Sequence, residues 1–157
     1  MERKVSDLLN IVHEEIELYR DLIHHVRRKT ALLVQGQTDA ILKSNKIEET
    51  FNARLRGLET EMQSLCLDLC RVLGIPCEEF TLLRLADGTE QSVALKIRDQ
   101  ACLFKNLIEQ LKCVNQRNIK LIEASAHYSR CLPELVSNSR QILQCGKPAV
   151  GAGWSER

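Results

Sequence analysis

The chain has 157 residues, enough for one domain, and its apolar fraction of 44% and charged fraction of 27% are ordinary for a globular protein. Its 22 basic and 21 acidic residues leave a net charge of +1, which excludes an overall field that would attract nucleic acid or an anionic membrane. The N-terminal residues lack the apolar core of a secretion signal, and no stretch reaches the roughly 20 apolar residues of a membrane span. We therefore expect a cytoplasmic chain that binds neither nucleic acid nor membrane.

The first predicted helix covers residues 5–34. Its apolar residues recur mostly at steps of three and four: Val5, Leu8, Leu9, Val12, Ile16, Tyr19, Leu22, Ile23 and Val26. The basic stretch "HHVRRK" lies near its C-terminal end, where cations complement the helix dipole, although a basic binding patch is an alternative. Gly36 is a plausible C-terminal cap, and Thr38 with Asp39 can open the next helix.

The second predicted helix covers residues 39–73. An alternation of four and three indicates a heptad seam made of Phe51, Leu55, Leu58, Met62, Leu65, Leu69 and Val72. Extending the seam backwards places Glu48 and Ser44 on it. Gly74 and Pro76 end the helix, and residues 77–88 have room for one short helix with Thr81 as its N-cap.

The third predicted helix opens at about Thr89 and keeps the same alternation for some fifty residues. Its seam is Val93, Ile97, Gln100, Phe104, Leu107, Leu111, Val114, Asn118, Leu121, Ser125, Tyr128, Leu132, Leu135, Ser139 and Ile142. At ~1.5 Å per residue this is a rod of roughly 75 Å. Pro133 is expected to kink it, or to separate a terminal helix over residues 134–144.

These elements predict an elongated all-α antiparallel bundle or coiled coil of three long helices with a short linking helix, in one domain over residues 1–145. Residues 146–157 contain three glycines and a proline, and we expect a flexible tail. Trp154, the only tryptophan, is either incidental there or an apolar anchor for a binding partner.

The seven cysteines argue against a disulfide framework, since their number is odd and no secretion signal is present. Cys66 and Cys70 lie one helical turn apart and could supply two metal ligands, so an electron-transfer or metal-binding bundle is one hypothesis. No CxxC motif occurs and the histidines show no matching spacing, so small apolar side chains are the simpler interpretation. We expect no metal and no cofactor.

Sequence motifs of catalysis are missing: there is no nucleophile elbow, phosphate loop, HExxH or dinucleotide turn. No glutamate is followed three residues later by a histidine, as a di-iron bundle requires. Adjacent glutamates such as Glu14 and Glu15 point in different directions on a helix. We therefore expect no enzyme and no catalytic residues, and the apolar stripes favour a protein that binds another helix.

The chain resembles the FlgN-type flagellar export chaperones over roughly Leu8 to Leu135. The features that carry the resemblance follow one another in order: "LLNIVHEEIELYRDLI", "VQGQTDAI", "NKIEETF", "LGIP", "FTLLRLADG" and "LKCVNQRNIKLIEASAHYSR". The last resembles the family's Asn-x-x-Asn segment, here Asn115 and Asn118, followed by an aromatic residue, here Tyr128. The cysteines and Pro133 depart from the family pattern.

The resemblance implies a cytoplasmic chaperone of bacterial flagellar assembly. Such a protein binds the helical C-terminal region of hook–filament junction (hook-associated) proteins before type III export, without a nucleotide or metal. Components of the export apparatus are a further class of partner, and the chain itself is expected to be a monomer or weak homodimer. The alternative is a structural coiled-coil adaptor that oligomerises through its heptad seams.

The client site is predicted on the distal half of the third helix, where polar residues interrupt the apolar seam. Polar seam residues cost stability but specify register and partner. The candidate residues are Asn118, Leu121, Ile122, Ser125, Tyr128, Leu132 and Leu135. Tyr128 is the strongest candidate, since tyrosine combines a large apolar area with a polar tip. The competing interpretation is that this face packs on the first or second helix.

Overall fold

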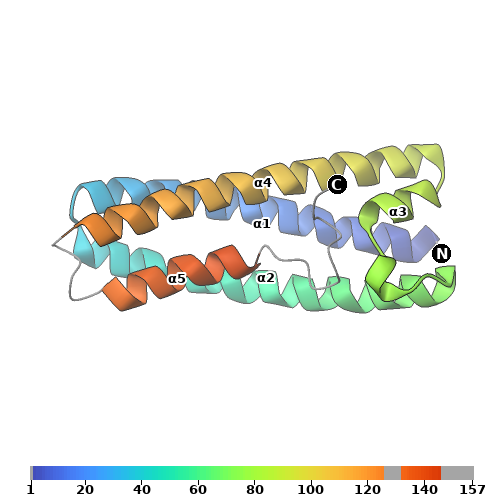
Figure 1. Ribbon diagram of the computed structural model, residues 1–157, viewed down its shortest axis with the longest axis horizontal. Coiled ribbons are helices and arrows are strands. Elements are labelled where there is room, and N and C mark those ends of the chain that lie inside the picture. Colours follow the sequence, from blue (N-terminus) through green and yellow to red (C-terminus); the bar gives the residue numbers. More distant parts are fainter. Residues whose placement is uncertain (1, 126–131, 146–157) are drawn as a thin grey trace. The chain divides into compact units, whose positions relative to one another are not determined.

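The computed structural model describes residues 2–125 and 132–145, and every regular element in those two ranges is a helix (Figure 1). The elements in chain order are α1 (Glu2–Val34), α2 (Thr38–Leu73), the 3-10 helix η1 (Cys77–Glu79), α3 (Leu82–Asp87), α4 (Gln91–Ala124) and α5 (Leu132–Cys145). The three long helices have 33, 36 and 34 residues, so each is about 50 Å long. The prediction of an all-α fold with long helices and a short linking helix is confirmed. The predicted tail and Trp154 lie outside the described residues.

Local sequence sets most of the helix ends. Gly36 and Gly74 have φ angles of 69° and 65°, in the left-handed region that glycine adopts without steric cost, and each follows the end of a long helix. Thr81 caps α3, because its side-chain oxygen accepts a hydrogen bond of 3.0 Å from the Arg84 N–H. The predicted caps and the predicted short helix are confirmed.

The third long helix is shorter than predicted. It ends at Ala124, and the Ser125 N–H donates to the carbonyl of Ile122 at 3.2 Å. A separate helix then begins at Leu132, so Pro133 lies in a first turn, where its missing N–H has no helical partner to lose. The prediction of a separate terminal helix at Pro133 is confirmed, whereas the prediction of one rod of fifty residues is wrong.

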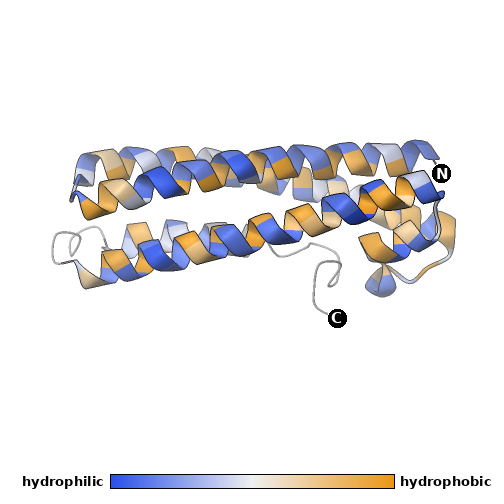
Figure 2. Cartoon of the chain, turned by 90° about the horizontal axis from the view of Figure 1, so that it is seen from above, coloured by the Kyte–Doolittle hydropathy of each residue, from blue (hydrophilic) through white to orange (hydrophobic). Residues whose placement is uncertain are grey.

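Each long helix buries a stripe that follows a heptad alternation, and Figure 2 shows hydrophobic and hydrophilic residues alternating along these helices. In α1 the stripe consists of Val5, Leu8, Val12, Glu15, Tyr19, Leu22, Val26, Lys29 and Leu33. In α2 it consists of Ile41, Asn45, Glu48, Asn52, Leu55, the half-buried Glu59, Met62, Cys66 and Leu69. In α4 it consists of Ile97, Ala101, Phe104, Ile108, Leu111, Asn115, Asn118 and Ile122. The apolar stripe predicted for α1 is confirmed except at Leu9, which is half-buried, and charged and amide side chains share the interior with it.

The predicted seam of α2 is correct at alternate positions only. Leu55, Met62 and Leu69 are buried, and so are Glu48 and Ser44. The predicted residues between them, Phe51, Leu58 and Leu65, are half-buried, and Val72 is 54% exposed. Asn52 and Cys66, one residue after Phe51 and Leu65, are buried, while Glu59 is half-buried like Leu58 before it. The same shift occurs in α4, where Asn115 and Ile122 are buried while Val114 and Leu121 are half-buried.

Leu69 and Leu65 therefore make a matched pair for testing the seam. Leu69→Ala is expected to lower the free energy of unfolding by about 2–5 kcal/mol, because Leu69 is fully buried and its loss leaves a cavity. Leu65→Ala is expected to cost less than half as much, because the side chain is only half-buried. Urea denaturation of both variants measures the difference, and equal losses would contradict the observed register.

The chain divides into two compact units, and all three long helices contribute to both. Of the described residues, unit 1 contains 2–17 and 56–106, and unit 2 contains 18–55, 107–125 and 132–145. In unit 1, Lys4 pairs with Asp68 of α2 at 2.6 Å, and Arg98 of α4 pairs with Asp87 of α3 at 2.7 Å. Because continuous helices run through both units, we retain the single domain over residues 1–145 as a prediction.

Candidate functional site

Within unit 2, Asn118 joins α4 to α1. Its side chain is completely buried, and its Nδ2 donates a hydrogen bond of 3.2 Å to the carbonyl oxygen of Val26. The Thr30 hydroxyl donates to Asn118 Oδ1 at 2.7 Å. Both ends of the amide are thus paired with α1, which fixes the register of the two helices. A buried amide at a seam position is costly unless it is paired, so this residue selects one helix alignment over others.

The helix α5 packs on the same end of unit 2. Four buried residues, one from each of α1, α2, α4 and α5, form a cluster: Leu33, Ile41, Ile122 and Leu135. The half-buried Leu121 and Val136 pack against that cluster. The interior at this end is therefore closed by α5 rather than open to solvent.

The structure brings part of the predicted client site together. Asn118, Ile122 and Leu135 are fully buried, and Leu121 and Ser125 are half-buried at the end of α4. Leu132 is the first residue of α5, and its side chain is not among those described. Tyr128 lies outside the described residues. The assignment of these seven residues to client binding stays a prediction.

A buried ion pair that the sequence did not reveal lies in unit 2. Lys29 Nζ of α1 donates to Glu48 Oε2 of α2 at 2.9 Å, and each side chain is only 1% exposed. His25 lies beside them, with its Nε2 4.0 Å from Glu48 Oε1. Burial raises the pKa of Glu48, although the charges of Lys29 and His25 oppose the shift. One sequence signal indicates that Lys29 is buried: it continues the heptad alternation from Val26 to Leu33. Because Lys29 also belongs to the basic stretch "HHVRRK", that signal is easily missed.

The polar atoms around His25 do not form a nucleophilic relay. Ser44 Oγ lies 2.8 Å from His25 Nε2, and Glu48 approaches the same nitrogen. A serine–histidine–acid relay instead requires the acid on the opposite ring nitrogen, Nδ1, to orient the imidazole. The arrangement is a buried polar network that links two helices.

Some buried amides of unit 2 carry unmatched polar atoms. Within residues 2–125 and 132–145, neither side-chain atom of Asn45 has a hydrogen-bond partner, and the same holds for Nδ2 of Asn115. Each such group costs about 1–3 kcal/mol compared with a paired one. The helical packing of unit 2 is therefore less favourable than an apolar interior of the same size would be.

Two neighbouring acidic side chains, one of them buried, lie in unit 1. Glu15 of α1 is 1% exposed, and Glu59 of α2 is half-buried nearby. Burial raises the pKa of Glu15 to about 8, and the charge of Glu59 adds to the shift. Burial also raises the pKa of Glu59 to about 7, against the opposing charge of Arg56. At neutral pH the carboxyl group of Glu15 is mainly protonated.

The cysteines proposed as metal ligands are buried in unit 1. Burial raises the pKa of the Cys66 thiol to about 12 and that of Cys70 to about 11, which disfavours the thiolate form that binds metals. Across the described residues, no three side chains of the metal-ligating types gather into a possible site. Both thiols pack as small apolar groups.

Comparison with known proteins gives one match. The FlgN protein family matches residues 1–142, which takes in α1 to α4 completely and most of α5. No curated protein sequence and no solved structure matches the chain. Among the helices of the described residues, none combines the length and apolar character needed to cross a membrane.

Proposed function

The chain belongs to the FlgN family of flagellar export chaperones, and from this membership we propose that it binds the helical C-terminal region of hook–filament junction proteins in the cytoplasm. By holding that region it keeps these clients competent for export by the flagellar type III system. The observation that carries the proposal is the family match over residues 1–142, supported by an all-α fold with amphipathic helices. Amphipathic helices commonly dock in apolar grooves between other helices.

The client site is proposed at the end of unit 2 where α5 meets α4. Ile122 and Leu135 are fully buried there, so a client reaches them only after α5 moves away. A client helix would then take over the contacts that Leu135 makes with Leu33, Ile41 and Ile122. Leu121, already half-buried at the edge of that cluster, would extend the apolar contact.

The contacts of α5 are compatible with displacement. It has 14 residues, against 33 to 36 in the long helices, so it buries less surface than they do. Its described buried face is partly polar: Ser139 Oγ donates to the carbonyl of Leu135 at 3.1 Å, and Asn138 Nδ2 donates to Glu49 Oε1 at 3.4 Å. A short helix with few apolar contacts is the kind of element that opens locally at low free-energy cost.

Tyr128→Ala is expected to weaken the binding of a peptide from the C-terminal helix of a hook–filament junction protein by at least ~2 kcal/mol, about thirtyfold. The reason is the loss of a large aromatic contact. Helix content should change little, since position 128 lies outside the bounds of α4 and α5. Isothermal titration calorimetry measures the affinity, and circular dichroism measures the fold.

Tyr128→Phe is the matched control, because it keeps the ring and removes only the hydroxyl, so most of the affinity should remain. If Tyr128→Ala unfolds the chain while the folded fraction binds normally, the residue is part of the core and the site lies elsewhere. Measuring the molecular mass in solution distinguishes the chaperone from the coiled-coil adaptor. A large obligate helical oligomer would support the adaptor.

A further inference from the structure

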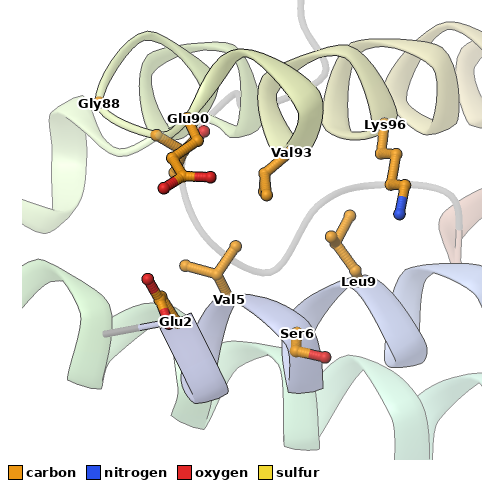
Figure 3. Close-up of a pocket in the computed structure, with 9 residues that line it drawn as sticks. Glu2, Val5, Ser6, Leu9, Gly88, Glu90, Val93 and Lys96 are labelled. Atoms are coloured by element: carbon orange, nitrogen blue, oxygen red, sulfur yellow. The ribbon is translucent and has the colours of Figure 1, made fainter.

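A groove lies between the first turns of α1 and the first turns of α4, entirely within unit 1 (Figure 3). It has a volume of about 620 Å³. A second hollow of about 370 Å³ shares Ser6, Leu9 and Lys96 with it and continues towards His13 and Gln100. On α4 the combined groove extends from the turn before the helix to Gln100, a length of roughly 18 Å. This length matches about three turns of a bound helix.

The floor of the groove is apolar. Figure 3 shows Val5 and Leu9 of α1 pointing towards Val93 of α4 across the space between the two helices. Leu9 and Val93 are half-buried, whereas the next seam residue of α4, Ile97, is 1% exposed. The packing of unit 1 thus leaves apolar surface at this groove that the chain's own described helices do not cover.

Charged side chains stand at the two ends of this floor. Glu2 and Glu90 lie together at one end, and Lys96 lies at the other (Figure 3). Within the described residues, none of these three side chains has an ion-pair or hydrogen-bond partner. An occupant of the groove can therefore pair with them without breaking a contact of the free protein.

The net charge of +1 is distributed unequally between the two units of the chain. The described residues of unit 1 include eight basic and thirteen acidic residues, a net charge of −5. The described residues of unit 2 include eleven basic and seven acidic residues, a net charge of +4. The field around the groove therefore favours a basic partner and disfavours an acidic one.

We propose that this groove binds a basic amphipathic helix of a partner protein. Its apolar stripe would cover Val5, Leu9 and Val93, and its basic residues would pair with Glu2 and Glu90. Electrostatic complementarity of this kind sets the orientation of the bound helix and speeds its association. The site is separate from the proposed client site, which lies in unit 2, so it does not rest on the proposed function.

The test uses the full chain and two synthetic amphipathic helices of about fifteen residues, enough to span the groove. They share one apolar stripe and differ only in carrying lysines or glutamates beside it. The basic peptide is expected to bind, with an affinity that falls as salt rises, and the acidic peptide is expected not to bind. Fluorescence anisotropy of labelled peptides measures both. Equal binding of the two peptides, or binding of neither, would overturn the proposal.

Reversing the charges of two groove residues tests whether the basic peptide binds in the groove. Glu2→Lys with Glu90→Lys is expected to weaken binding of the basic peptide about tenfold, because two opposite-charge contacts become repulsive. Glu61→Lys with Glu78→Lys is the matched control, since it makes the same charge change at exposed positions of unit 1 outside the groove. It should change the affinity by less than about twofold. An equal loss in both variants would show general attraction to unit 1 and would overturn the groove assignment.

A second copy of the chain is the competing occupant. Sedimentation of the free protein decides this case: a dimer that Glu2→Lys with Glu90→Lys abolishes would assign the groove to self-association and overturn the proposal. Leu9→Ala is the second variant, because it shortens the apolar floor without changing charge. It should weaken peptide binding while the circular dichroism spectrum stays that of the unchanged chain, and unaltered binding would count against the groove.

Discussion

Replacing Lys29 with methionine is expected to lower the free energy of unfolding by about 3–5 kcal/mol. Methionine fills a similar volume, so the effect does not come from a cavity. It comes from Glu48, whose carboxylate would stay buried without the ammonium group that now lies 2.9 Å away. An unpaired buried charge is among the most costly groups in a protein interior. Denaturant unfolding at neutral pH measures the loss.

The double variant Lys29→Met with Glu48→Leu separates the charge from the packing. It removes both charges, so most of the lost stability should return, because a buried ion pair is often no more stabilising than apolar residues of similar volume. Lys43→Met, at an exposed position of α2, is the control and should have little effect. A single variant that loses less than about 1 kcal/mol would mean that Glu48 becomes protonated or solvated at little cost.

The stability of the chain is expected to fall as the pH rises from about 5 to about 8, on account of Glu15. Its pKa is near 4.5 in the unfolded chain and about 8 in the folded one, so the folded state holds a proton that the unfolded state has released. The free energy of unfolding therefore decreases with pH in this window, since the native state binds more protons. The full loss is on the order of 4 kcal/mol. The half-buried Glu59 adds a smaller contribution of the same sign.

Glu15→Gln tests this dependence directly. Glutamine is isosteric with the protonated acid, so the variant should match the unchanged chain near pH 5 and exceed it in stability at pH 8. Glu14→Gln, at the exposed neighbouring position, is the control and should keep the pH dependence. Thermal unfolding across the pH range provides the comparison. A slope that Glu15→Gln leaves intact would assign the titration to another group.

These two predictions concern the same property of the bundle, an interior that is partly polar. The buried stripes of α1 and α2 include Glu15, Lys29, Asn45 and Glu48, where leucine or isoleucine would make a more stable bundle. Paired polar groups at seam positions specify which helices align and in which register, at a cost in stability. Under the proposed function, in which α5 moves away to admit a client helix, such modest stability would make that opening less costly.

Much of the local structure follows from the sequence alone. Gly36 and Gly74 end the first two helices because glycine adopts positive φ without steric cost, and both signals act within a few residues. Thr81 opens α3 for the same local reason, through its own side chain. The apolar stripe of α1 is also readable, since most of its buried positions are apolar. The FlgN resemblance rests on these features in series, and the family match over residues 1–142 confirms it.

The register of the seams required the tertiary structure. On α2 the apolar residues Phe51 and Leu65 indicate one heptad alternation, but the residues that follow them, Asn52 and Cys66, are the buried ones. Apolar residues flank the true seam on both sides, so periodicity does not choose between two positions that differ by one residue. The choice depends on partners from another helix, and Lys29 and Glu48 are 19 residues apart in sequence.

The sequence by itself determined that this protein is all-α, where its first helices end, that the third helix is interrupted near Pro133, and the family to which it belongs. Only the tertiary structure decided that α4 ends at Ala124, that α5 covers Ile122, and that Asn118 is paired with α1 rather than exposed. The physical reason is the separation in sequence between the residues that determine each feature. Caps and turns depend on the conformational preferences of a few adjacent residues, whereas burial of a polar side chain depends on whether a distant helix supplies its hydrogen-bond partner.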